Sequence, residues 1–338
     1  MDSVTQFALG AAVGEAVLGR KVGNRAPLWG GLVATVPDLD VIPGQFLDPV
    51  ARLAFHRGVT HSILFAVALA PLLGGLLARL RRNAGADRHD WTRLSFWALV
   101  THPLLDCFTT WGTQLFWPLP YRVAINSIFV VDPLYTLPLV VTLIWLARKR
   151  DPAARRRLNW IGLGLSSLYL ALTLVNKGVM NQRFEEILAE KQIPYTRFMT
   201  RPTPLNNVLW TASAETETGF YIVHHSLLDG DRAVPVFFLP KNHELLGELA
   251  HHERVQKLLS ILNYYIVEPL PDGVLVHDIR FGQVGGWHDG RGEFVFSYEI
   301  RAVGSDGATA VEIRRRSGSV RFSRDRFAQL LSRITRWE

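Results

Sequence analysis

The chain has 338 residues, enough for two domains of ordinary size, and a formal net charge of +7. Its composition is 48% hydrophobic and 20% charged, but these averages combine two unlike halves. Long apolar blocks fill the chain up to about residue 176, whereas charged and apolar residues mix after that point, as in a soluble fold. The basic excess gathers in short loops beside apolar segments, which is typical of a membrane protein and argues against nucleic-acid binding. The single cysteine, Cys107, excludes an intrachain disulfide.

Six apolar segments in the first half are candidate membrane spans. A span needs roughly 20 residues to cross about 30 Å of hydrocarbon. The segments are 4–18, 27–36, 62–80, 94–110, 134–147 and 158–175, and the first two are short and rich in glycine. In the first segment, Gly10 and Gly14 are spaced for close helix contact, although the spacing can also be merely tolerated. We predict a polytopic α-helical membrane domain over residues 1–176.

The basic loops predict the orientation of this domain. Basic residues gather at 20–25, 79–93 and 148–157. All three loops face the cytoplasm if the segment 62–80 runs inward and the segment 94–110 runs outward. The second half of the chain, residues 177–338, then lies outside the cytoplasm.

The second half reads as a soluble α+β domain with a mainly antiparallel sheet. Seven strand-like runs, several of them separated by turn signals, are predicted at 208–212, 220–224, 234–239, 264–267, 274–279, 294–300 and 311–314. Helices are predicted at 243–261 and 324–337. The pairs His224-His225 and His251-His252 are expected to be surface residues, because adjacent side chains on a strand face opposite ways.

Ionisable residues interrupt or flank the apolar segments of the first half. Such groups are costly at membrane depth unless they have partners or water, so each is a functional candidate. They are Asp38, Asp40, His56, Arg57, His61, His102, Asp106 and Asp132.

Spacing groups several of these residues. His102 and Asp106 are four apart, which puts both on one face of a helix, one turn from each other. They can bind one metal ion together, or the carboxylate can orient the imidazole; an ordinary hydrogen bond on the helix surface is the alternative. Asp38 and Asp40 follow a proline, and in extended backbone an i, i+2 pair points to one side.

The stretch from His56 to His61 needs a turn to bring its two histidines together. We expect Gly58 to provide this turn and Thr60 to cap the following helix. The helix N-terminus would keep His61 neutral and ready to ligate. Arg57 is either a simple loop charge or a clamp for a phosphate or carboxylate.

In the predicted topology these residues converge at the extracytoplasmic ends of their segments. Three histidines and four carboxylates are the ligand mix for one or two divalent transition metal ions, with zinc expected first and manganese second. Two such ions could activate water and neutralise a developing oxyanion. Structural polar contacts are the alternative interpretation.

The run from His56 to Ser62, with the upstream Asp38/Asp40 pair and the downstream His102-x-x-x-Asp106, closely resembles the YdjM family. The stretches 132–135 and 202–206 also look like longer members. The resemblance implies a bacterial inner-membrane protein with an ascribed metal-dependent hydrolase activity. It also implies metal-site roles for a set of six residues: Asp38, Asp40, His56, His61, His102 and Asp106.

These observations favour a membrane-embedded metal-dependent hydrolase that acts on a lipid or lipid-linked ester, with a phosphoester as the expected substrate. In this hypothesis Asp132 ligates metal or acts as a base, and Arg57 holds the substrate anion. The expected partners are the lipid bilayer and the lipid substrate, with no nucleic acid. The alternative is a non-enzymatic transporter or assembly factor that uses the same polar cluster. Transporters often show internal repeats, and none is evident in the sequence.

Overall fold

The computed structural model describes residues 1–81, 85–303, 310–316 and 323–335. These residues form two compact units. The first, which we call the helical unit, comprises Met1–Phe46, Phe55–Asn176 and Pro204–Asn206. The second, which we call the sheet unit, comprises Leu47–Ala54, Lys177–Thr203 and Asn207–Glu338.

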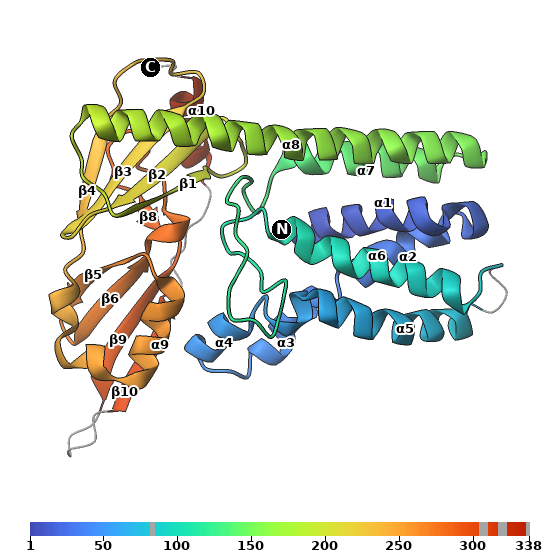
Figure 1. Cartoon of the computed structure of the whole chain (residues 1–338), viewed down its shortest axis with the longest axis horizontal. Helices are drawn as coiled ribbons and strands as arrows, with labels where there is room; N and C mark the ends of the chain where they lie inside the picture. Colours follow the sequence, from blue (N-terminus) through green and yellow to red (C-terminus); the bar gives the residue numbers. More distant parts are fainter. Residues whose placement is uncertain (82–84, 304–309, 317–322, 336–338) are drawn as a thin grey trace. The chain divides into compact units, whose positions relative to one another are not determined.

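All six apolar segments predicted from the sequence are helical. The elements of the first half are α1 Ser3–Val22, α2 Arg25–Ala34, η1 Pro37–Asp40, α3 Val41–Gly44, α4 Pro49–Phe55, η2 Val59–His61, α5 Ile63–Leu80, α6 Arg88–Asp106, α7 Pro133–Ala147 and α8 Pro152–Glu190 (Figure 1). Among the described helices, α5 and α8 are long and apolar enough to cross a membrane, and α7 is apolar but shorter. A helical first half is thus confirmed, whereas only two of the six predicted spans meet this length and composition criterion. The charged first turn of α6 and the short length of α2 account for part of the difference.

The close contact predicted for the glycines of α1 is present. A Cβ on Gly10 would lie 2.2 Å from the Cβ of Ala34, and one on Gly14 would lie 2.4 Å from the carbonyl oxygen of Ala26. On the facing helix α2, a Cβ on Gly30 would lie 2.3 Å from the carbonyl oxygen of Gly10. Backbone therefore packs on backbone between α1 and α2, as small residues allow in membrane helices.

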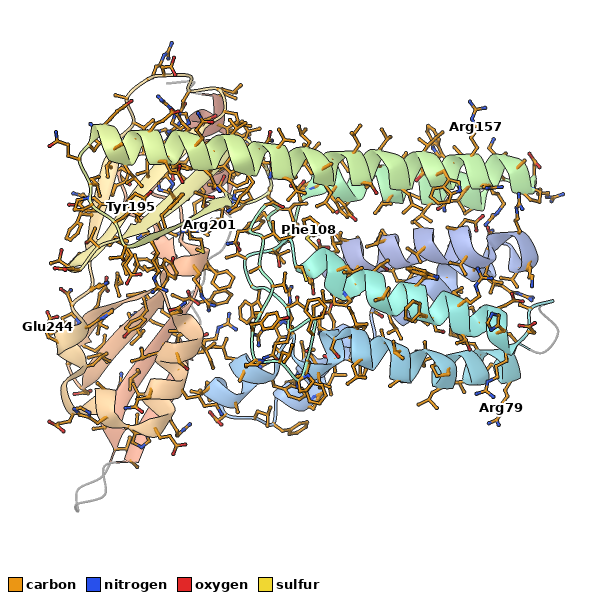
Figure 2. All side chains as sticks on the ribbon, in the orientation of Figure 1. Arg79, Phe108, Arg157, Tyr195, Arg201 and Glu244 are labelled. Atoms are coloured by element: carbon orange, nitrogen blue, oxygen red, sulfur yellow. The ribbon has the colours of Figure 1, made fainter. Side chains whose placement is uncertain are left out.

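Basic residues gather at one end of the helical unit. The C-terminal end of α5, the N-terminal end of α6 and the turn from α7 to α8 lie at one end, where Arg79 and Arg157 are labelled (Figures 1 and 2). Phe108, just past the end of α6, is at the other end (Figure 2). One basic residue of the 148–157 loop is buried. Arg155 pairs with Glu15 of α1, with Nη2 2.6 Å from Oε2.

The sheet unit contains two four-stranded antiparallel sheets and a small third one. The first has the order β1-β2-β3-β4, with β1 Arg197–Pro202, β2 Leu209–Glu215, β3 Gly219–Ser226 and β4 Val236–Pro240. The second has the order β10-β9-β6-β5, with β5 Tyr265–Leu270, β6 Gly273–Asp278, β9 Ser297–Val303 and β10 Ala310–Arg316. The two-stranded sheet pairs β7 Gln283–Val284 with β8 Glu293–Phe294, and η4 Ile279–Phe281 precedes it. The predicted antiparallel pairing is confirmed. The prediction of a single sheet is wrong, and strand β1 was not predicted.

The helices of the sheet unit also differ from the prediction. The predicted helix 243–261 is divided into η3 His243–His251 and α9 Glu253–Leu262, because Gly247 adopts φ 46° and His252 is extended and caps α9. The last helix, α10, runs Arg324–Thr335, and the predicted end at 337 lies outside the described residues. The expectation that His224 and His225 are surface residues is wrong, since both are buried between packed strands.

Candidate metal centre

Four of the predicted ligands meet at one point in the helical unit. They are Asp38, His61, His102 and Asp106, and one ligand atom of each lies within 4.8 Å of the others. The two imidazole Nε2 atoms are 3.2 Å apart. Asp38 Oδ1 lies 3.3 Å from His61 Nε2 and 3.4 Å from His102 Nε2. Asp106 Oδ2 lies 3.5 Å from each of the same two nitrogens.

These distances fit a tetrahedral metal ion. A zinc ion with bonds of 2.0–2.1 Å to nitrogen and oxygen holds its ligand atoms about 3.3–3.4 Å apart. Five of the six edges between the four atoms measure 3.2–3.5 Å. Asp106 Oδ2 is buried and accepts no hydrogen bond from any described residue, although a buried carboxylate oxygen normally has a partner. The donor set of two imidazoles and two carboxylates is one that zinc and manganese accept.

Three elements supply the candidate ligands. His102 and Asp106 lie one turn apart in α6, His61 ends η2, and Asp38 lies in η1. The expectation that Asp38 and Asp40 share an extended segment is wrong. Pro37 begins a 3₁₀ turn in which Asp38 faces the four-residue group and Asp40 faces away from it toward the loop after α4.

The second nitrogen of His102 fixes its orientation. Nδ1 donates to the carbonyl oxygen of Ala34 at 2.6 Å, so the ring is held with Nε2 facing the group. The second oxygen of Asp106, Oδ1, accepts from Nε2 of Gln6 at 3.1 Å and contacts the amino group of Met1. Neither Gln6 nor Ala34 carries a sequence signal for this role, because their contacts depend on how α1 and α2 pack against α6.

Asp40 and His56 form a neighbouring pair outside the four-residue group. Asp40 Oδ1 is 3.0 Å from Nδ1 of His56, and Oδ2 accepts from the backbone N–H of Arg57 at 3.0 Å and from the hydroxyl of Thr60 at 3.2 Å. Asp40 Oδ2 is also 3.6 Å from Nδ1 of His61. The hydroxyl of Thr60 lies 3.0 Å from Nδ1 of His61, so Asp40 holds this imidazole from behind through Thr60, as a partner of a ligating imidazole does.

The loop before α5 is built differently from the expectation. Arg57, not Gly58, adopts a positive φ of 58°, and Ser62, not Thr60, caps α5 by accepting from the N–H of Phe65 at 3.1 Å. The Arg57 guanidinium is buried, with Nε 3.4 Å from Asp106 Oδ2 and Nη1 donating to Thr109 at 2.9 Å. The guanidinium cation of Arg57 therefore lies directly beside the four-residue group.

Burial and hydrogen bonds together set the charge of His61 and Asp38, which lie outside the long apolar helices. It lowers the pKa of His61 to about 4, so this imidazole is neutral at pH 7, the form that ligates a metal. Burial opposes ionisation of Asp38, but hydrogen bonds with His102 and His61 outweigh it and hold the pKa of Asp38 well below its usual range. Asp38 is therefore a carboxylate at neutral pH.

Asp132 is not a member of the four-residue group. It caps α7, where Oδ1 accepts from the N–H of Leu134 at 3.0 Å, and its Oδ2 accepts from the hydroxyl of Tyr169 at 2.8 Å. Burial raises the pKa of Asp132. In the structure this residue ties α7 to α8.

A family model described as "YdjM inner membrane protein" matches residues 1–180, more than half of the chain and all four grouped residues. The chain belongs to the YdjM family. The inner membrane protein YbcI of Escherichia coli (strain K12) is 32% identical over 118 residues, which are 35% of this chain and 66% of YbcI. The matched region is thus just under two thirds of that relative's own length. No solved structure matches. YdjM membership and this relative assign the chain to the inner membrane.

Proposed function

We propose that this protein is a multi-pass, metal-dependent hydrolase of the inner membrane that acts on a lipid or lipid-linked phosphoester. The observation that carries the proposal is the set of five distances of 3.2–3.5 Å among Asp38, His61, His102 and Asp106. Placing two carboxylates in one largely buried group is costly, and a cation held by all four side chains offsets that cost.

The four residues would hold a divalent transition metal ion, and zinc is the ion expected first. Such an ion would supply a Lewis acid for a substrate oxygen. Asp40 orients His61 from behind, and the backbone carbonyl of Ala34 orients His102. The pairing of Asp40 with His56, which is partly exposed, leaves a second acid–base pair beside the group.

Arg57 supports a phosphoester as the substrate. Its guanidinium is buried beside Asp106, and its Nε makes no hydrogen bond with any described residue. A fixed guanidinium matches two oxygens of a tetrahedral anion. The lipid character of the substrate follows from location, because a group held by helices of an inner-membrane protein is reached most directly from the bilayer.

The first test is metal content. Protein purified in detergent without chelator and resupplied with zinc or manganese should retain at least one equivalent by elemental analysis, and His61→Ala should lose it. His89→Ala is the matched control, since His89 is an exposed histidine in the first turn of α6. Wild-type protein that stays metal-free under these conditions would refute the proposal.

The second test is turnover. Protein reconstituted in vesicles of phosphatidylethanolamine and phosphatidylglycerol, with a lipid-linked phosphate added, should release a phosphorylated or free head group, and chelator should abolish the release. Arg57→Lys should lower the rate at least tenfold, because lysine lacks the fork of donors. Arg156→Lys, at an exposed position of α8, should leave it unchanged. If the wild-type protein turns over only uncharged esters and the Arg57→Lys variant is fully active, the reaction is acyl hydrolysis and not phosphoester hydrolysis.

One observation favours a second candidate function. A tetrahedral site filled by four protein ligands is typical of structural metal ions, whereas catalytic zinc keeps one position open. A transporter or assembly factor with a structural ion would bind metal in the first test and show no turnover in the second.

A further inference from the structure

The sheet unit contains a small internal cavity that the metal centre does not involve. Its polar lining comes from Arg201 on β1, Thr211 on β2 and His224 on β3, with Gln283 of β7. Apolar residues such as Ile222 and Phe294 close it. Its volume of about 10 Å³ has room for one occupant the size of a water molecule.

Arg201 lines this cavity as a buried cation that forms no ion pair with any residue the structure describes. Only 5% of the residue is exposed, and its Nη1 donates to the hydroxyl of Ser213 at 3.0 Å. Its Nη2 has no hydrogen-bond partner among the described residues. The nearby carboxylate of Asp278 is occupied by Arg280, whose Nη2 lies 2.7 Å from Oδ2. A buried, uncompensated guanidinium is costly, so a compensating negative charge is expected at this position.

The backbone beside Arg201 is shaped around its guanidinium. Gly282 adopts φ +67°, and a Cβ at that position would lie 2.6 Å from Arg201 Nη2. The turn after η4 thus packs directly against the donor and restricts its movement (Figure 2 labels Arg201 beside the first sheet). The unpaired nitrogen is held in a fixed place.

His224, which lines the same cavity, carries a second unpaired nitrogen. Only 5% of this residue is exposed, and its Nδ1 lies 2.9 Å from the hydroxyl of Thr211. Its Nε2 has no hydrogen-bond partner among the described residues. Burial together with the charges of Arg201 and Arg333 lowers the pKa of His224 to about 3, so the ring is neutral. When the Thr211 hydroxyl donates to Nδ1, the single ring proton is on Nε2, and both unpaired atoms are donors.

We propose that this cavity is a binding site for a monoatomic anion of the halide class, held between Arg201 Nη2 and His224 Nε2. A halide accepts hydrogen bonds from both donors and compensates the guanidinium charge, which a water molecule cannot do. The volume leaves no room for a phosphate or a carboxylate. The site lies wholly within the sheet unit and is independent of the proposed hydrolase activity.

Chloride binding can be tested on the full chain in a nonionic detergent by ³⁵Cl NMR. Wild-type protein should broaden the chloride resonance beyond the detergent background, and added bromide should reverse the excess broadening by competition. Arg201→Met should remove at least nine-tenths of the excess. Arg314→Met, at an exposed arginine of β10, should keep it. Equal broadening by wild-type protein and Arg201→Met would overturn the proposal.

A second measurement does not depend on the folding of a variant. Wild-type crystals soaked in bromide should give an anomalous peak between Arg201 and His224. A water molecule at that position, with no anomalous signal at any bromide concentration that the crystals survive, would equally overturn the proposal.

Discussion

At the scale of single residues, Asp40 shows how a carboxylate can support a candidate metal centre without belonging to the four-residue group. It accepts from the backbone of Arg57 and from Thr60, pairs with His56, and lies 3.6 Å from the outer nitrogen of His61. One side chain therefore fixes the loop that delivers a ligand and orients the ligand itself.

We expect Asp40→Asn to weaken metal binding without abolishing the site. The four grouped side chains remain, but His61 loses the carboxylate behind it, and changes at such positions lower metal affinity roughly 10–100-fold. Competition with a chromophoric chelator measures the change in affinity. Asp231→Asn, at a fully exposed carboxylate, should bind as wild type does. An affinity within twofold of wild type in Asp40→Asn would contradict this role.

Part of the candidate site could be predicted from spacing. The i, i+4 interval predicted that His102 and Asp106 lie together, because residues four apart share one face of a helix. The different roles of Asp38 and Asp40 could not be predicted, since they depend on a 3₁₀ turn in place of extended chain. The positive φ of Arg57 could not be predicted either, because the neighbouring Gly58 is the residue type that normally adopts such a conformation.

At the scale of elements, the contact between α1 and α2 positions a ligand of the metal centre. Gly10 faces Ala34, the last residue of α2, and the carbonyl of Ala34 accepts from His102. Any separation of these two helices moves the acceptor that orients the imidazole. The packing of two glycine-rich helices is thus coupled to the geometry of the group.

Gly10→Ala should destabilise the protein by about 1–3 kcal/mol, since its methyl group would overlap backbone and side-chain atoms of α2. Gly164→Ala, in α8, meets no atom within 4 Å and should be neutral or stabilising by up to about 1 kcal/mol from helix propensity. Thermal unfolding in detergent, followed by circular dichroism, compares the two. Equal midpoints for both variants would show that α1 and α2 are not in close contact.

Periodic and apolar elements were predictable, whereas irregular ones were not. The six apolar helices follow from composition alone. Strand β1 was missed because its sequence places arginines at both 197 and 201 and ends in proline, a pattern unlike an alternating strand. The kink at Gly247 inside η3 was missed because an isolated glycine is compatible with a continuous helix.

At the scale of the whole molecule, charge is distributed unequally along the helical unit. The basic loops after α5 and α7 lie at one end, and the C-terminal end of α6 lies at the other (Figure 1). Lys21 at the end of α1 also pairs with Asp90 at the start of α6. By the positive-inside bias, we propose that this basic end is cytoplasmic and that the metal centre lies toward the outside.

Cysteine labelling on intact spheroplasts measures this orientation. With the buried Cys107 replaced by alanine, a His89→Cys variant should react with an impermeant maleimide only after lysis. A Ser260→Cys variant, at an exposed position of α9, should react before lysis. The reverse pattern would put the metal centre at the cytoplasmic side.

The position of the four grouped residues along the chain has a consequence for biogenesis. All of them lie within the first 106 of 338 residues, whereas the first strand of the sheet unit begins at Arg197. Because a chain is synthesised from its N-terminus, every ligand is available before the sheet unit exists. In the proposed function, the ion can therefore be captured during insertion of the helices, and metal supply at that moment would decide how much of the newly made protein matures.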